Sequence, residues 1–365
     1  MKPDEIYMNR CLELAKLAIG AVAPNPMVGS VIVHRGKVIS EGFHQYYGGK
    51  HAEASAIEKI SDKSILKQST LYVNLEPCAH QGKTPPCAML IKRCEIPRVV
   101  VGTADTNPAV AGKGIAYLRN AGIDVKTGIL EDACIELNRR FFTFHALRRP
   151  YVILKWAQTA DGYIDILRNQ GDNRGINWIS NETSRTLVHK WRSEEQAIMA
   201  GTNTARMDNP KLNTRHWWGK SPMRIVIDKK LSLPGHLHLF DCQVHTIVFN
   251  ALKNDIASDN LEYVKTDFDK DFLPYMMDFL FKRGIQSMIV EGGKHLTESF
   301  IKANLWDEGR VFIGQKQFKS GLKAPDTGKE PVEQISIQED MLLVYKNYAL
   351  FRDQIKNAIR QIDLK

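Results

Sequence analysis

The strongest constraint on this chain is a set of metal-ligand residues with a distinctive spacing. His51 and Glu53 stand one residue apart, and Cys78 and Cys87 follow after one strand-like run. One imidazole and two thiolates give zinc three protein ligands and leave the fourth tetrahedral position for water, whereas structural zinc sites are closed by four ligands. Glu53 stands where a carboxylate can pass a proton between that water and a substrate. The pattern therefore predicts a catalytic zinc site.

The same residues are similar to the signature of zinc deaminases that act on nucleobases, H-x-E followed by P-C-x-x-C. The second part differs, because eight residues, 79–86, separate the two cysteines. A lone cysteine or histidine is more often a packed core residue, but three ligands together with Glu53 favour a metal site. A structural zinc would need a fourth ligand. His80 is the nearest candidate, and its position two residues after Cys78 suits contact with a substrate better.

Length and composition predict the general class of the protein. A chain of 365 residues exceeds the usual size of one domain, so we expect two domains. The apolar and charged fractions, 43% and 25%, are those of an ordinary soluble protein. No apolar stretch approaches the roughly 20 residues of a membrane span, and the first residues lack the apolar core of a signal peptide. Six scattered cysteines form no disulfide framework, which favours a reducing cytoplasm.

The charge balance indicates the kind of ligand. Fifty Lys and Arg residues against 41 Asp and Glu residues give a formal net charge of +9. Such an excess suits either nucleic acid or small phosphorylated ligands. The sequence has no run of five or six basic residues and no interleaving of aromatic and basic residues along a strand-binding track. We therefore expect a small phosphorylated ligand.

The first half of the chain reads as alternating strands and helices. Helices are predicted at 4–18, 51–60 and 114–120, and strands at 28–33, 37–41, 71–75, 98–101 and 123–126, with a hairpin turn at Arg35-Gly36. Thr84 followed by two prolines resembles a helix start, which places Cys87 where the helix dipole favours the thiolate. The pattern predicts an α/β/α sandwich with partly parallel strands.

The second half follows the basic linker Arg148-Arg149-Pro150. Strands are predicted at 151–155, 197–200, 224–228, 245–249, 287–290 and 310–313, and helices at 182–191, 272–283 and 296–303. Beyond these we expect a loop at 323–331 and one strand at 341–345. Neither G-x-G-x-x-G nor G-x-x-x-x-G-K-[ST] is present. The pair Gly292-Gly293 follows a predicted strand, where exposed backbone N–H groups can approach a diphosphate.

Several motifs of the first half can be compared with a known family. They are Pro24-Asn25-Pro26, Gly42-x-His44, His51-Ala-Glu53, the long loop from Leu75-Glu-Pro-Cys78 to Cys87, and Asp105-x-Asn107. Together they resemble the deaminase half of the bifunctional riboflavin-biosynthesis deaminase/reductase family. The resemblance implies a cytidine-deaminase-like fold in which His51, Cys78 and Cys87 bind zinc and Glu53 shuttles protons. It further implies contacts to the base or the ribose phosphate from Asn25, His44, Lys83, Thr84, Asp105 and Asn107.

The second half resembles the reductase half of the same family. The motifs are Lys155-x-Ala157-x-Thr159-x-Asp161-Gly162, Trp178-Ile-Ser, Gly201-x-x-Thr204, Asp208-x-Pro-x-Leu212-x-x-Arg215 and Val290-Glu291-Gly-Gly. The resemblance implies a dihydrofolate-reductase-like α/β domain that uses NADPH. The implied cofactor-binding residues are Ala157, Thr159, Trp178, Thr204, Asp208, Gly292 and Gly293. The implied substrate-binding residues are Arg192, Leu212, Arg215 and Glu291. Two features depart from the family pattern: a longer stretch between Gly162 and Trp178, and an apolar residue at Ile176.

The resemblance implies a bifunctional enzyme with a deaminase domain at 1–147 and a reductase domain at 148–365. Its substrates would be phosphorylated pyrimidines: 2,5-diamino-6-ribosylamino-4(3H)-pyrimidinone 5′-phosphate is deaminated with zinc, and the ribosyl group of the resulting uracil is reduced to ribityl with NADPH. We expect neither nucleic acid nor a membrane as a partner. The sequence leaves open whether the chain forms a homo-oligomer.

The zinc-ligand pattern is also compatible with two other functions. A zinc deaminase could act on a base in nucleic acid, with the second half as a binding module. Alternatively, zinc could only hold the fold of a binding or structural protein. The loop with Lys83 and Thr84 and the turn after Glu291 favour the bifunctional enzyme over the first alternative. Glu53 argues against the second, because a structural zinc site needs no proton shuttle.

Overall fold

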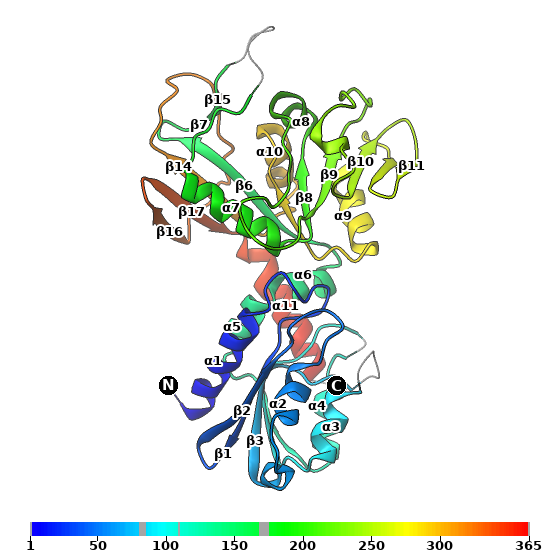
Figure 1. Cartoon of the computed structure of the whole chain (residues 1–365), viewed down its shortest axis with the longest axis vertical. Coiled ribbons are helices and arrows are strands. Elements are labelled where there is room, and N and C mark those ends of the chain that lie inside the picture. The colour runs from blue at the N-terminus through cyan, green and yellow to red at the C-terminus, as the bar shows by residue number, and fades with distance from the viewer. Residues whose placement is uncertain (1, 80–84, 109, 168–174, 364–365) are drawn as a thin grey trace. The chain divides into compact units, whose positions relative to one another are not determined.

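The computed structural model describes residues 2–79, 85–108, 110–167 and 175–363, and these form two compact units (Figure 1). Unit 1 comprises Met1–Arg148 together with Leu350–Lys365, and unit 2 comprises Arg149–Ala349. The break after residue 148 lies one residue from the boundary expected from the sequence. The C-terminal segment differs from the expectation, because it belongs to unit 1 and not to the domain that precedes it in the chain.

Unit 1 is built on a five-stranded sheet with the order β2-β1-β3-β4-β5. The strands are β1 (Gly29–His34), β2 (Lys37–Phe43), β3 (Ser69–Leu75), β4 (Arg98–Thr103) and β5 (Asp124–Lys126). Strand β1 pairs antiparallel with β2 and β3, whereas β3, β4 and β5 are parallel. The predicted hairpin is confirmed: Arg35 and Gly36 both have positive φ, as a tight two-residue turn requires.

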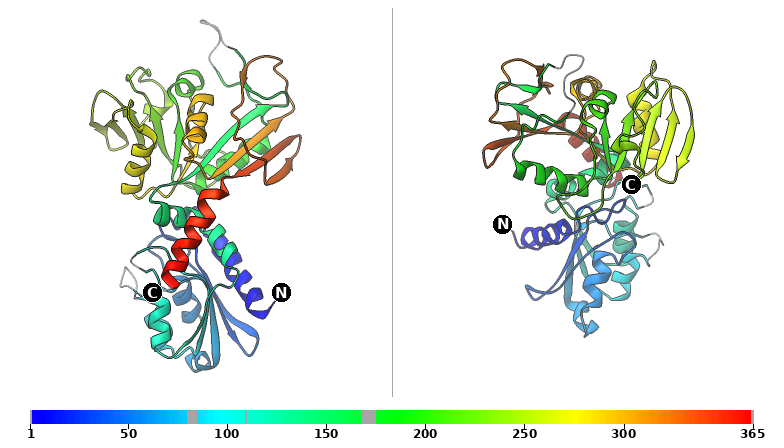
Figure 2. Two further views of the ribbon diagram at one scale, coloured as in Figure 1. Left: turned by 180° about the vertical axis from the view of Figure 1, so that it is seen from behind. Right: turned by 45° about the horizontal axis from the view of Figure 1, so that its top comes forward.

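Helices cover both faces of this sheet, as the further views in Figure 2 show. They are α1 (Pro3–Lys16), α2 (Ala52–Glu58), α3 (Cys87–Arg93), α4 (Lys113–Asn120), α5 (Glu131–Leu137) and α6 (Arg139–Leu147), with a 3₁₀ helix at Lys63–Gln68. Alternate residues of β1 point to opposite faces, so that Ile32 packs with α2, α3 and α4 while Val31 and Val33 pack with α1 and α5. The predicted α/β/α sandwich is confirmed.

The C-terminal helix α11 (Tyr348–Asp363) explains why the end of the chain belongs to unit 1. Ile355 and Ile359, four residues apart on one helix face, are buried in an apolar cluster with Leu75 and Ile115. Lys356 adds an ion pair of 2.5 Å to Asp132. The sequence analysis assigned no helix here, because two isoleucines in a polar segment are a weak periodic signal.

Unit 2 holds a ten-stranded sheet with the order β11-β12-β10-β9-β8-β13-β6-β14-β17-β16. Within this order, all the strands from β12 through β10, β9, β8, β13 and β6 to β14 are parallel to one another. Strands β11, β17 and β16, at the two edges, are antiparallel to their neighbours. The strands are β6 (Tyr151–Thr159), β8 (Ala197–Ala200), β9 (Met223–Ile227), β10 (Thr246–Asn250), β11 (Asp255–Ser258), β12 (Leu261–Lys265), β13 (Ser287–Val290), β14 (Glu308–Gly314), β16 (Glu333–Ile337) and β17 (Asp340–Lys346). A separate pair joins β7 (Tyr163–Asp165) to β15 (Leu322–Lys323).

Helices also cover both faces of this second sheet. They are α7 (Glu182–Glu194), α8 (Thr202–Asp208), α9 (Phe272–Lys282) and α10 (Lys294–Lys302), with a 3₁₀ turn at His238–Phe240. In β6, Val152 and Leu154 pack with α9 and α10, whereas Tyr151 and Ile153 pack with α7. The strands and helices predicted for this half begin within two residues of the observed ones. The strands that were not predicted include β11 and β16, which are mostly exposed and lack a buried alternate face. Among the described helices, none is both long and apolar enough to span a membrane.

We predict that Ile359→Ala lowers the stability of unit 1 by about 2–5 kcal/mol, because it removes a buried side chain and leaves a cavity. Urea unfolding, followed by hydrogen exchange of peptides from β3 and β4, measures the effect. The control is Asn357→Ala, which alters an exposed residue of the same helix. Equal stability of the two variants would contradict the packing of α11 in unit 1.

Candidate active sites

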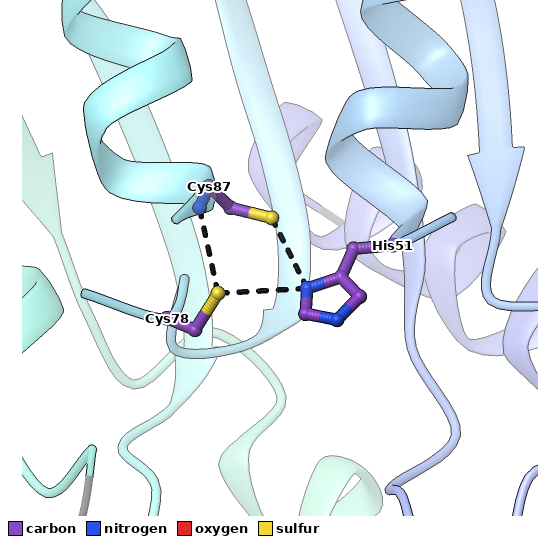
Figure 3. A group of neighbouring side chains, drawn as sticks. All are labelled: His51, Cys78 and Cys87. Atoms are coloured by element: carbon purple, nitrogen blue, oxygen red, sulfur yellow. Dashed lines mark hydrogen bonds between the residues drawn. The ribbon is translucent and has the colours of Figure 1, made fainter. Parts of the chain in front are cut away.

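Three metal-ligand side chains meet in unit 1 (Figure 3). His51 immediately precedes α2, Cys78 follows β3, and Cys87 is the first residue of α3. The Nδ1 atom of His51 lies 3.5 Å from Sγ of Cys78 and 3.3 Å from Sγ of Cys87, and all three ligand atoms lie within 4.8 Å of one another. One nitrogen and two sulfur donors converging on one point fit a zinc ion.

The local environment favours negative charge on sulfur. Hydrogen bonds from Cys87 and His51 lower the pKa of the Cys78 thiol. One of them comes from the backbone N–H of Cys87 at the start of α3, 3.4 Å from Sγ of Cys78. The prediction that Cys87 stands at a helix start is confirmed, with Pro86 before it. Thr84, which the sequence suggested as the cap, and His80 lie outside the described residues.

Glu53 occupies the first turn of α2 and is 3% exposed. Burial raises its pKa, and the negative charge of Cys78 adds to the shift. Its carboxyl also hydrogen-bonds with the side chain of Cys87, which places it beside the metal ligands. A carboxyl whose pKa is raised holds a proton more readily than an exposed one, which suits a group that passes protons beside a metal site.

Asn25 and His44 stand together at the histidine side of the triad. Nδ1 of His44 lies 2.9 Å from the carbonyl oxygen of Lys50, so this nitrogen carries the proton and Nε2 accepts from the Asn25 amide at 3.0 Å. Burial lowers the pKa of His44, which keeps the ring neutral. The rings of His44 and His51 meet edge to face with centroids 5.5 Å apart.

Asp105 and Asn107 stand at the cysteine side of the triad. Asp105 lies two residues after the end of β4, whose parallel neighbour β3 leads to Cys78. The Asp105 carboxylate accepts the backbone N–H of Asn107 at 2.7 Å, and burial raises the pKa of Asp105 to about 7. Of the six side chains expected to contact this substrate, His44 packs against His51, Asn25 bonds to His44, and the charge of Cys78 acts on Asp105, while Asn107 contacts Asp105 through its backbone. Lys83 and Thr84 lie outside the described residues.

Unit 2 contains a cavity of about 890 Å³. Its walls include ten residues that the sequence analysis assigned to cofactor or substrate: Ala157, Trp178, Arg192, Thr204, Asp208, Leu212, Arg215, Glu291, Gly292 and Gly293. Ile176, the apolar departure from the family pattern, also lines it. Thr159 is not among the lining residues: it is fully buried, and its hydroxyl bonds to Asp161 at 2.5 Å and to the N–H of Tyr163 at 3.0 Å. Thr159 thus shapes the turn after β6.

A buried ion cluster forms one wall of the cavity. Arg192 donates two hydrogen bonds to Glu291, at 2.9 and 2.8 Å, and Nζ of Lys155 lies 3.8 Å from the same carboxylate. Burial by itself would raise the pKa of Glu291. The positive charges of Arg192 and Lys155 outweigh this effect and lower the pKa to about 2. The carboxylate is therefore ionised at neutral pH. Lys155 belongs to a motif of the reductase half, but no role in the site was expected for it. The feature that indicates such a role is a single cation in an otherwise apolar strand.

Four arginines line the cavity, and two of them, Arg192 and Arg215, were assigned to the substrate by the sequence analysis. The backbone N–H of Arg215 donates to Nδ1 of His189 at 3.2 Å. Burial and the two neighbouring cations lower the pKa of His189 to about 3, so the ring stays neutral and adds no further positive charge beside the arginines. A planar guanidinium suits a phosphate, which it can bind through two hydrogen bonds.

The glycine pair forms another wall of the cavity. Gly292 follows β13 and Gly293 caps α10, while Gly201 caps α8 after the adjacent parallel strand β8. A Cβ atom on Gly292 would lie 2.6 Å from Cδ2 of Leu296, and one on Gly293 would lie 3.2 Å from Oγ1 of Thr204. A side chain at position 292 would therefore force Leu296 to move, and one at position 293 would crowd Thr204. Two neighbouring helix starts fit the diphosphate of a dinucleotide.

Comparison with known proteins agrees with both sites. Residues 1–103 match the cytidine and deoxycytidylate deaminase zinc-binding region, and residues 150–318 match the RibD C-terminal domain. The chain is 38% identical to riboflavin biosynthesis protein RibD of Aquifex aeolicus, over 94% of this chain and 99% of the relative. The chain belongs to the RibD family. The protein of Bacillus amyloliquefaciens is 39% identical over 84% and 82% of the two chains.

A solved structure shows the same fold. The diaminohydroxyphosphoribosylaminopyrimidine deaminase/5-amino-6-(5-phosphoribosylamino)uracil reductase of Thermotoga maritima is 36% identical, with a TM-score of 0.83 over 94% of this chain and 98% of that one. Members of the RibD family are bifunctional, and this chain combines a zinc-dependent deaminase domain with an NADPH-dependent reductase domain in riboflavin biosynthesis. The fold class and the two cofactors expected from the sequence are confirmed.

We predict that the wild-type chain binds about one zinc ion, and that Cys87→Ser loses most of the metal and of the ammonia release, because one of three protein ligands is removed. Metal analysis and a deaminase assay measure both. The control is Cys94→Ser, which alters a half-buried cysteine at the other end of α3. Full zinc content and full activity in Cys87→Ser would contradict the ligand assignment.

Proposed function

We propose that this enzyme catalyses the two reactions for which the Thermotoga maritima structure is named. The first removes an amino group from the diaminopyrimidinone ribosylamino-phosphate by hydrolysis, and the second reduces the ribosyl group of the phosphoribosylamino-uracil to ribityl. One observation carries the proposal: a single chain holds both a metal-ligand triad beside a buried carboxyl and a cavity with paired guanidinium groups beside a glycine turn.

In the deaminase site, His51, Cys78 and Cys87 would hold zinc, which lowers the pKa of water and so supplies the hydrolytic nucleophile. Glu53 takes a proton from the attacking water and delivers it to the leaving amine, so that the ring carbon gains oxygen and ammonia departs. The carboxyl must release as well as accept that proton, which its raised pKa allows. No other described carboxyl shares a hydrogen bond with Cys87.

The neighbouring side chains would bind the pyrimidine and its phosphate. The Asn25 amide is oriented by His44, and Asp105 is oriented by the backbone of Asn107, so these groups present fixed donors and acceptors. Lys83 and Thr84 belong to the same proposed substrate site by resemblance. Fixed polar groups around the base favour a small aminated pyrimidine as substrate.

In the reductase site, NADPH would lie along the glycine turn and the start of α8, where Ala157, Trp178, Thr204 and Asp208 line the wall. The cofactor supplies the hydride. Arg215 and Arg192 would hold the substrate phosphate, and Leu212 would pack against the substrate. Glu291, fixed by Arg192 and Lys155, presents a constant negative charge to the sugar hydroxyls. Thr159 would act on this site only through the turn it forms.

The proposed partners are small phosphorylated pyrimidines, without nucleic acid or membrane. The cavity of unit 2 and the arginines that line it match a phosphorylated nucleotide in size and charge. None of the six cysteines forms a disulfide, which supports a reducing compartment and hence a cytoplasmic location.

We predict that the two activities can be removed separately. Glu53→Gln keeps the size of the side chain but removes the titrating carboxyl, so ammonia release should fall by about 10²–10⁴-fold. Zinc should stay bound, and reduction of the uracil substrate should be unchanged. Conversely, Arg215→Ala should impair only the reduction. Each variant is measured in both assays. Loss of both activities in folded, zinc-loaded Glu53→Gln would contradict two independent sites.

We predict that kcat/KM is about 10–100-fold higher with NADPH than with NADH, the factor expected for a charge-assisted contact to the additional phosphate. Arg206 and Lys211 line the same cavity and provide positive charge for it. Steady-state kinetics with both cofactors at a fixed concentration of the uracil substrate measure the ratio. Equal values would contradict this specificity.

A further inference from the structure

We propose that Glu76 is a positioning residue of the deaminase reaction, which holds Asp105 and Gly112, the two ends of a substrate-binding loop, against the metal-binding turn. This proposal deepens the proposed function and rests on it. Glu76 is neither a metal ligand nor a predicted substrate contact, and no motif assigns it a role beyond its place before Pro77 and Cys78. Its side chain is 5% exposed.

The Glu76 carboxylate accepts four backbone hydrogen bonds. One oxygen accepts the N–H groups of Asp105 at 3.1 Å and Gly112 at 2.9 Å. The other accepts those of Gly114 at 2.8 Å and Ile115 at 3.1 Å. Asp105 and Gly112 are the two ends of the loop, and Gly114 and Ile115 belong to the first turn of α4. One side chain thus closes the loop and caps the helix that follows it.

Four backbone N–H donors suit the two oxygens of a carboxyl group better than an amide of the same shape. Four N–H donors need four acceptor lone pairs, which a carboxylate provides. A glutamine would turn its own NH₂ group toward two of these donors and leave them without an acceptor. Negative charge also stabilises the start of α4. We therefore expect glutamine at this position to release one end of the loop.

The loop is also held close to the metal ligands. A Cβ atom on Gly114 would lie 1.8 Å from the carbonyl oxygen of Pro77, so the start of α4 packs directly on the residue before Cys78. Glu76 itself forms a backbone bond to β4, with its N–H donating to the carbonyl of Thr103 at 3.0 Å. A shift of the loop therefore moves Asp105 relative to the triad.

A second residue of the same strand end behaves in the same way. Asn74, fully buried and two residues before Glu76, accepts the N–H of Gly29 at 2.8 Å and donates to the carbonyl of Met27 at 3.0 Å. It thereby fixes the segment that follows Asn25. Asn74 lies near the end of β3, and Glu76 and Cys78 follow that strand within three residues. The two polar side chains hold the two substrate-binding segments on either side of the metal ligand.

The test compares Glu76→Gln with Glu41→Gln, which alters a surface carboxylate paired with Arg10 in the same unit. Zinc content, ammonia release with the diaminopyrimidinone nucleotide, and NADPH oxidation with the uracil substrate are measured for each. We expect Glu76→Gln to keep its zinc and its reductase activity while kcat/KM for deamination falls about 10–100-fold, mainly through a higher KM. Hydrogen exchange of residues 105–115 should accelerate, while that of α2 should not. Glu41→Gln should match wild type.

Three results would overturn the proposal. Unchanged deaminase kinetics in zinc-loaded Glu76→Gln would show that the loop needs no such anchor. Loss of activity in proportion to loss of zinc would place Glu76 in support of the metal alone. If Glu76→Gln does not fold, Glu76→Asp is measured by the same criteria, and failure of both to fold would mean a purely structural role. A wild-type enzyme that releases no ammonia would instead contradict the proposed function.

Discussion

The parallel pairing of β3 with β4 is the interaction on which the deaminase site depends. Its register places Leu75 opposite Thr103, so both strands end at the same edge of the sheet. The chain therefore delivers Cys78 from one strand and Asp105 from the other to one place, as open α/β sheets do at the carboxyl ends of their strands. His51 and Cys87 arrive at the starts of α2 and α3. Local sequence places each ligand, but the strand pairing brings the substrate loop to the metal.

The reductase site depends on buried charge. Glu291 and Arg192 are each about one-tenth exposed, and removing such groups from water is costly unless they are paired and hydrogen-bonded. The bidentate contact satisfies this requirement, and Lys155 supplies further positive charge. The cluster joins β6, α7 and the end of β13, three segments far apart in the chain. A polar wall of this kind gives the cavity a fixed electrostatic pattern before any ligand enters.

The sequence predicted what local patterns encode. The zinc ligands are recognisable because metal binding needs particular residue types, and most core strands are recognisable because they are continuously apolar. The donors to Glu76 could not be predicted, since they are backbone groups about 30 to 40 residues away and every residue has one. The place of α11 in unit 1 could not be predicted either, because Ile355 and Ile359 specify an apolar face but not its partner. Thr159 was assigned from its motif alone, and its hydroxyl is used within the turn.

Two buried glutamates show how neighbouring charge decides chemical role. Glu53 and Glu291 are both removed from water, which by itself favours the protonated form. Glu291 faces two cations, so it stays ionised and cannot exchange protons near neutral pH. Glu53 faces the sulfur of Cys78, whose negative charge adds to the effect of burial, and the opposing effect of His51 is smaller, so the pKa of Glu53 is raised. The same type of side chain therefore suits proton transfer in one unit and a fixed negative charge in the other.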